Sequence, residues 1–212
     1  MGTGLYTWWK NWSTKVVNKF IDRYDRARIR NKDFTILCPN CIGGNIYHRL
    51  GLQFRTPTIN LFMSQSDFIK LIHDPKIYFD QKLRFIPSNQ SFPVAMLGDI
   101  KLNFNHDHVE SEAAEKWYRR VVRVNWDNIY IILYEELPFS REEILSLQTI
   151  PCKRLVVLTS EKTHIDLPYV KYIKRHLGRR NERHFLDRDF FNVQTFEKHF
   201  NFVSWLNGSN RF

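Results

Sequence analysis

The hydrophobic and polar positions change period along the chain, and these changes predict alternating strands and helices. Short, mainly apolar runs predict strands at 34–38, 58–62, 128–134 and 155–158, and the run 155–158 is apolar throughout. Apolar positions three or four residues apart predict helices at 6–30, 42–50, 66–72, 110–124 and 192–206. Two further runs, 92–97 and 100–104, bracket Gly98-Asp99, which is typical of a hairpin turn. The pattern therefore predicts a three-layer α/β fold, with a mainly parallel mixed sheet flanked by helices.

The helix predicted at 6–30 is amphipathic and basic. Its apolar positions are Trp9, Trp12, Val16, Phe20, Tyr24 and Ala27, and the adjoining basic stripe is Lys15, Lys19, Arg23, Arg26 and Arg30. One interpretation is that the aromatic face packs on the body of the protein. The other is that the helix lies on an anionic membrane surface. We expect residues 1–32 to form this helix and residues 33–212 to form a single α/β domain.

Charge narrows the class of partner. The 212 residues carry a formal charge of +10, with 43% hydrophobic and 25% charged residues, which argues against a disordered chain. Residues 1–32 hold eight Lys or Arg against two Asp, and residues 171–188 hold seven against two acids, so the remainder is almost neutral. This predicts an anionic small molecule or an anionic membrane as partner. Nucleic acid is not favoured, because no groove-reading motif accompanies the charge.

The same chain shows neither a long apolar run nor a secretory signal. The sequence therefore predicts a cytoplasmic protein, with the basic helix as its means of peripheral attachment to the inner face of the membrane.

A cysteine- and glycine-containing loop, Cys38-Pro-Asn-Cys-Ile-Gly-Gly44, follows the first predicted strand. The two cysteines could form a redox dithiol. A zinc site is not favoured, because the sequence has no second cysteine pair to complete it. Loops in this position often bind ligands at the adjoining helix N-terminus. Asn40, Gly43 and Gly44 would then approach the ligand, and Cys41 would act as nucleophile. The alternative is a tight turn with an inert thiol.

Two further clusters could carry chemistry. Asp99 lies at the hairpin turn, and His106 and His108 follow the next strand, so His106 with Asp99 could act as a general base. The two histidines could instead ligate a metal, or belong to a solvated loop. On the helix at 110–124, the residues Arg119, Arg120 and Arg123 predict either an anion clamp or an ordinary solvated face.

Taken in order, these segments resemble the exopolysaccharide and capsular polysaccharide biosynthesis family of unknown function. The resemblance covers roughly residues 33–160 and includes Leu50-Gly-Leu52, Thr56-Pro-Thr-Ile59, Glu112-Ala113 and Trp117. The matching site positions are Asn40, Cys41, Gly43, Gly44, Asp99, His106, Arg120, Asn125, Trp126 and Asp127. Cys38-Pro39 departs from the family pattern, which counts against a redox dithiol. The resemblance implies a compact three-layer α/β fold and a role in bacterial surface-polysaccharide synthesis.

Residues and resemblance together predict a transferase for capsule, exopolysaccharide or O-antigen. The favoured reaction is acyl transfer from a coenzyme A-type donor to a sugar hydroxyl of a glycan or lipid-linked glycan. Cys41, His106 and Asp99 would be catalytic, and the substrate-binding residues would be Asn40, Gly43, Gly44, Arg119, Arg120, Arg123, Asn125, Trp126 and Asp127. One alternative is a glycosyl- or phosphosugar-transferase that uses a nucleotide sugar, with a divalent metal on Asp99 and Asp127. Another is a non-catalytic accessory protein that binds membrane or polymer.

Overall fold

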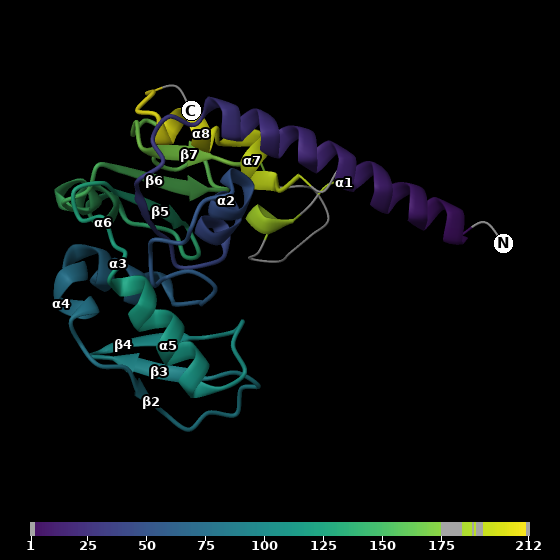
Figure 1. Ribbon diagram of the computed structural model, residues 1–212. Helices are drawn as coiled ribbons and strands as arrows, with labels where there is room; N and C mark the ends of the chain where they lie inside the picture. The colour runs from purple at the N-terminus through teal and green to yellow at the C-terminus, as the bar shows by residue number, and fades with distance from the viewer. Residues whose placement is uncertain (1–2, 175–183, 188, 190–192, 211–212) are drawn as a thin grey trace.

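The fold is built around a four-stranded parallel sheet, seen in a computed structural model that describes residues 3–174, 184–187, 189 and 193–210 (Figure 1). The strands are β1 (Thr35–Leu37), β5 (Ile129–Tyr134), β6 (Arg154–Thr159) and β7 (Val170–Tyr172), in the order β1-β5-β6-β7. All neighbouring pairs are parallel, as expected for a sheet whose central strands, β5 and β6, are mainly apolar.

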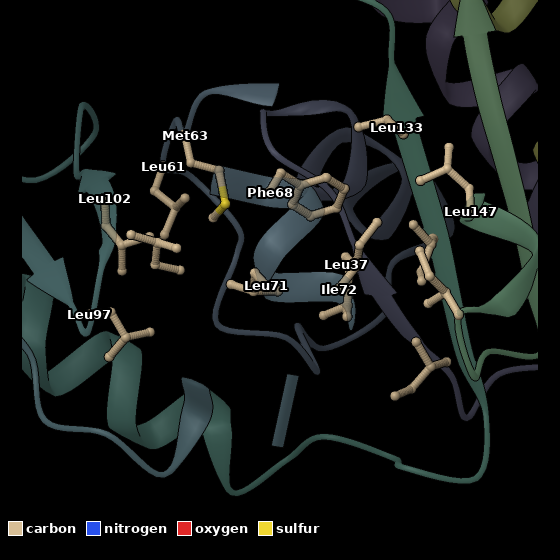
Figure 2. Packing of buried hydrophobic residues seen from close by; sticks show 14 of the residues in the cluster. Leu37, Leu61, Met63, Phe68, Leu71, Ile72, Leu97, Leu102, Leu133 and Leu147 are labelled. Atoms are coloured by element: carbon tan, nitrogen blue, oxygen red, sulfur yellow. The ribbon is translucent and has the colours of Figure 1, made fainter. Parts of the chain in front are cut away.

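Both faces of this sheet are buried. In β5, Ile131 and Leu133 point to one side, and Tyr130 and Ile132 point to the other. The first side packs on α3 (Gln65–His73), α6 (Arg141–Ser146) and the short turn η1 (Leu147–Thr149) (Figure 2). The second side packs on α2 (Ile42–Leu50), η2 (His184–Leu186), α7 (Thr195–His199) and α8 (Phe202–Leu206). The predicted three-layer α/β architecture is confirmed.

A second, smaller sheet is antiparallel, with strands β2 (Arg84–Phe85), β3 (Val94–Leu97) and β4 (Ile100–Asn103) in that order. Gly98, at a φ of 62°, makes the predicted hairpin turn. The hairpin does not join the parallel sheet to make it mixed, because β3 pairs with β2 and β4 instead. The helices α4 (Pro75–Phe79) and α5 (Glu110–Val121) contribute to the core that this sheet shares with the first side of the parallel sheet.

Several local predictions differ from the structure. The apolar run 58–62 forms turns rather than a strand, with Asn60 at a φ of 61° and one isolated bridge from Phe62 to Asn103. The C-terminal helix is two helices, because the Asn201 side chain accepts the Ser204 N–H and begins α8 anew. A capping box formed by Ser140 and Glu143 begins α6.

The helix α1 (Thr3–Arg28) forms as predicted but presents an unexpected side to the body. Phe20 and Tyr24, from the predicted packing face, are 70% and 60% exposed, whereas Ile29 just beyond the helix is buried. The interpretation that this stripe packs on the body is therefore wrong for these side chains. Within the described residues, no helix combines the length and apolar character that crossing a bilayer requires. Most of the basic segment 171–188 lies outside the described residues.

Candidate functional site

Cys41 and His106 come together although they are 65 residues apart in the chain, with 3.2 Å between Cys41 Sγ and His106 Nε2. Cys41 lies between the carboxyl end of β1 and the first residue of α2 and is half-buried, whereas His106 is exposed in the loop after β4. The distance is that of a hydrogen bond involving sulfur. The pair can therefore exchange a proton, with the thiol as donor and a neutral imidazole as acceptor.

The loop that carries His106 is held to α5 by an ion pair. Asp107 is buried, and its Oδ1 lies 2.6 Å from Lys116 Nζ on α5. The Asp107 N–H also donates to the Phe104 carbonyl, which closes the turn. The residue beside His106 is thereby anchored, so the imidazole starts from a fixed backbone position.

A cavity of about 680 Å³ opens beside the Cys41–His106 pair. Its apolar and aromatic lining comes from Leu61, Phe62, Tyr134, Phe185 and Leu186. Its other lining residues are polar: Asn40, Asn105, Glu136 and Asp187. Cys41 and Tyr134 stand at the carboxyl ends of β1 and β5, the edge at which parallel α/β sheets bind their ligands. An apolar chamber with a few polar groups is the usual form of a small-molecule site.

The side chain of Asn40 organises the loop before α2. Its Oδ1 accepts the Ile42 N–H at 2.9 Å and the Cys38 thiol at 3.1 Å. Because Oδ1 is bonded within the loop, the Nδ2 group is the part of the Asn40 amide that can donate to a ligand in the cavity, which Asn40 lines. The Ile42 N–H is thus occupied within the loop, and the Asn40 amide is the better donor to a ligand.

Cys38 is a structural thiol. It is 1% exposed, and burial raises its pKa to about 12 despite backbone hydrogen bonds from Asn40 and Gly43. Its thiol donates to Asn40 and forms no disulfide with Cys41. The two cysteines of the motif therefore have different roles, and the redox-dithiol interpretation has no support in this geometry.

Gly43 and Gly44 serve packing rather than ligand contact. A Cβ on Gly43 would lie 3.3 Å from Ile36 Cγ2, and one on Gly44 would lie 3.2 Å from Asn60 Oδ1. Both glycines are buried and neither lines the cavity. The absence of side chains lets α2 approach β1 and the turn at Asn60, so this geometry favours close packing over the predicted role in substrate binding.

Asp99 does not orient His106. Its Oδ2 accepts from Lys70 Nζ at 2.7 Å and its Oδ1 from the Tyr78 hydroxyl at 2.7 Å, and these bonds, with that of Lys70 the larger effect, lower the pKa of Asp99. Asp99 precedes β4 and His106 follows it, and a four-residue strand separates its ends by about 13 Å. Within the described part of the chain, His106 Nδ1 has no hydrogen-bond partner. The site is a Cys–His dyad, and His108 lines a separate surface hollow.

The contacts of Arg119 and Arg120 on α5, and of Arg123 just beyond it, do not support an anion clamp. Arg119 is paired with Glu115 on the helix surface at 2.7 Å. Arg120 is buried, donates from Nη1 to the Ile59 carbonyl at 3.0 Å and lies over the Phe54 ring. Burial lowers the pKa of Arg120, with the charge of Asp107 acting in the opposite direction. Neither Arg119, Arg120 nor the half-buried Arg123 lines the cavity.

The Asn125-Trp126-Asp127 turn lies at the amino end of β5, the edge opposite Cys41. Asn125 receives the Asp127 N–H on Oδ1 and donates its own N–H to Thr35 Oγ1 at 2.8 Å. The Trp126 ring lies 5.8 Å from that of Phe79. These contacts connect α5 to the sheet, and they favour a structural role for the three residues over the predicted substrate binding.

The predicted metal pair also lacks support, because neither Asp99 nor Asp127 lines the cavity. No group of three or more His, Cys, Asp or Glu side chains able to hold a metal ion occurs within the described ranges.

Sequence reasoning missed several polar residues of the cavity. Glu136 follows directly on β5, and a carboxylate at the carboxyl end of a buried strand was a usable signal. Asp187 belongs to a segment near the C-terminus, and no sequence pattern indicates that this segment packs beside the loop of Cys41. Asn105 was passed over in favour of its neighbour His106.

Comparison with known sequences places the chain among relatives. An uncharacterized protein of Haemophilus influenzae (strain ATCC 51907 / DSM 11121 / KW20 / Rd) is 29% identical over 188 residues, which is 89% of this chain and 91% of that protein. The resemblance to polysaccharide-biosynthesis proteins is not tested by this similarity and stays a prediction. The profile described as Domain of unknown function (DUF1919) matches residues 12–207, a range that includes both sheets and the Cys–His dyad. The chain therefore belongs to the DUF1919 family.

Proposed function

We propose that this protein is a transferase that uses Cys41 and His106 to move an acyl group onto a hydroxyl of a surface-polysaccharide glycan. The observation that carries the proposal is the 3.2 Å distance between Cys41 Sγ and His106 Nε2, beside a cavity. A thiol next to an imidazole is a common activated nucleophile, because the ring accepts the thiol proton as sulfur attacks. The donor is an acyl thioester of the coenzyme A type, and the acceptor is a sugar hydroxyl.

The reaction divides into two steps that share one proton carrier. First, Cys41 Sγ gives its proton to His106 Nε2 and attacks the thioester carbonyl, and the donor thiol leaves with that proton. An acyl group is then bound to Cys41 as a thioester. Next, His106 removes the proton of the sugar hydroxyl, whose oxygen attacks the Cys41 thioester. The sulfur of Cys41 leaves as thiolate and recovers the proton from His106.

The residues that line the cavity suit the acyl group, the oxyanion and the sugar of these two steps. The apolar wall suits an acyl chain, and the Nδ2 group of Asn40 is available to stabilise the oxyanion that forms at the carbonyl. Carboxylates such as Glu136 accept hydrogen bonds from hydroxyl groups, and the aromatic ring of Tyr134 offers an apolar surface to a sugar. The described lining contains no Lys or Arg, which favours a neutral acceptor here.

The nucleotide-donor alternative has less support, because Lys70 and Tyr78 already occupy both carboxylate oxygens of Asp99. The non-catalytic alternative has less support as well, because binding alone does not require a thiol and an imidazole within hydrogen-bond distance beside the cavity. Chelation separates the first alternative from our proposal, since a nucleotide-donor enzyme of this kind would lose activity with its divalent ion.

Acylation of the intact chain by acetyl-coenzyme A tests the covalent step. Mass spectrometry should find one acetyl group on Cys41 of the natural chain, in the presence or absence of a chelator. Cys41→Ala should abolish the adduct and His106→Ala should slow its formation about a hundredfold or more, the usual scale for loss of a general base. Cys152→Ser and Asp99→Asn are matched controls that should keep the natural rate. Equal acetylation of the Cys41→Ala chain would contradict the proposal.

A further inference from the structure

The outer side of α1 carries exposed aromatic and basic side chains, and of these Tyr24 also borders the hollow between α1 and α8 and has Arg28 over its ring. An α-helix turns about 100° per residue, so Phe20 and Tyr24 share one side and Asp25 and Ile29 lie on the opposite side. Phe20 is 70% exposed and Tyr24 60%, and Lys19 and Arg23 beside them are exposed as well. We call these four residues the outer face of α1. Two large aromatic side chains exposed together on one side of a helix form an apolar patch of the kind that marks interaction sites.

Ionic contacts fix the rotation of the helix. Arg49, whose side chain is 7% exposed, lies between Asp22 of α1 at 3.3 Å and Glu197 of α7 at 2.6 Å. Arg26 of α1 donates from Nε to the Arg49 carbonyl at 3.0 Å. Turning α1 to bury the aromatic side chains would break the contacts of Asp22 and Arg26 and leave the buried Arg49 guanidinium with one carboxylate, that of Glu197, instead of two. Exposure of the outer face therefore follows from the way the helix is attached.

The charge of the outer face has one sign. Residues 1–32 contain only two acids, Asp22 and Asp25. Asp22 faces the body through Arg49, and burial raises the pKa of Asp25, which lines a hollow between α1 and α8. Both acids are thus turned inward, whereas Lys19 and Arg23 are exposed. The exposed side of the helix is consequently cationic and aromatic.

We infer that the outer face of α1 binds the surface of an anionic lipid bilayer. Aromatic side chains enter the boundary between headgroups and acyl chains, and Lys and Arg attract anionic headgroups. The sequence continues the same spacing towards the N-terminus with Trp12 and Trp9, and Figure 1 shows α1 extending beyond the body of the protein. A second copy of the chain fits less well, because pairing would bring two cationic surfaces together. This inference does not depend on the transferase proposal.

Sedimentation of the full-length chain with vesicles tests the inference. The natural chain should pellet with vesicles of equal parts phosphatidylcholine and phosphatidylserine, and much less with phosphatidylcholine alone. The double variants Lys19→Glu/Arg23→Glu and Phe20→Ser/Tyr24→Ser should each bind the anionic vesicles at least about tenfold more weakly. Val122→Ser is the matched control. It removes an apolar side chain that is 83% exposed but lies at the end of α5 rather than on α1, so this variant should bind normally.

Three results would overturn the inference. One is equal binding to both kinds of vesicle, and another is unchanged binding by either double variant. The third is a chain that ignores vesicles but forms a dimer that Phe20→Ser/Tyr24→Ser dissociates, which would assign the outer face to a second copy. All four replaced side chains are exposed, so each variant should unfold at the same temperature as the natural chain. An unchanged unfolding temperature excludes misfolding as the cause of weaker binding.

Discussion

Selective alkylation of Cys41 by iodoacetamide is the most direct consequence of the site geometry. The chain has three cysteines, all of them free of disulfides, so each could react in principle. Only Cys41 has both partial exposure and a hydrogen bond to an imidazole. We expect one alkyl group per chain at early times, located on Cys41, because iodoacetamide reacts with the thiolate form.

The raised pKa values of the other two cysteines determine how much more slowly they should be alkylated. Burial raises the pKa of Cys38 to about 12 and that of Cys152 to about 11. At about pH 8, an ordinary thiol with a pKa near 8.5 is about one quarter ionised, whereas Cys152 is about one part in a thousand ionised and Cys38 about one part in ten thousand. Alkylation at these two positions should therefore be slower than at an ordinary exposed thiol by about two to three orders of magnitude, before burial slows it further. Their rates should rise about tenfold for each pH unit, because each unit multiplies the thiolate fraction tenfold.

Peptide mapping by mass spectrometry over a time course measures all three rates at once. His106→Ala should slow alkylation of Cys41 at neutral pH, since the proton acceptor is lost, and should leave Cys38 and Cys152 unchanged. Cys152→Ser serves as the control, with unaltered labelling of Cys41. The reasoning fails if Cys38 or Cys152 reacts as fast as Cys41, or if His106→Ala leaves the rate at Cys41 unaltered at every pH.

Three substitutions test the remaining structural assignments. Trp117→Ala removes one of the largest fully buried side chains and should cost about 3–5 kcal/mol of unfolding free energy, measured by urea denaturation. Arg120→Met leaves the Ile59 carbonyl without its donor, so stability should fall by about 1–3 kcal/mol; loss of turnover with unchanged stability would instead restore the anion clamp. Asp107→Asn weakens the ion pair with Lys116 and should lower the acetylation rate at Cys41 while the core stays folded, a result that an unchanged rate would refute.

The fold class was predictable because burial on both faces leaves a direct trace in the sequence. Strand β5 is buried at every position, so its run Ile129–Tyr134 is apolar throughout. The hairpin turn was readable because a positive φ favours glycine, which stands at position 98. The run 58–62 misled the prediction, since buried turns are as apolar as buried strands and only the positive φ of Asn60 distinguishes them.

The candidate site was only partly predictable. Residue type and position single out Cys41 and His106 in the sequence, but the same criteria pair His106 with Asp99, since one lies before and the other after the same predicted strand. In the structure, a strand separates them and Lys70 holds the carboxylate. The polar and aromatic residues of the Asn125-Trp126-Asp127 turn suggest function, yet the Asn125 side chain donates to the Asp33 carbonyl and accepts the Asp127 N–H at the edge of the sheet opposite Cys41.

The sequence by itself determined the properties that depend on near neighbours in the chain. These are the helix and strand periods, the capping box at Ser140, the turn at Gly98 and the concentration of basic residues in 1–32. Only the tertiary structure decided which distant residues meet and which side of an element is covered. The contact of Cys41 with His106 depends on the packing of two sheets around a shared core. The outward turn of Phe20 depends on the ion pair of Asp22 with Arg49, because a helical period defines two sides without stating which one faces the protein.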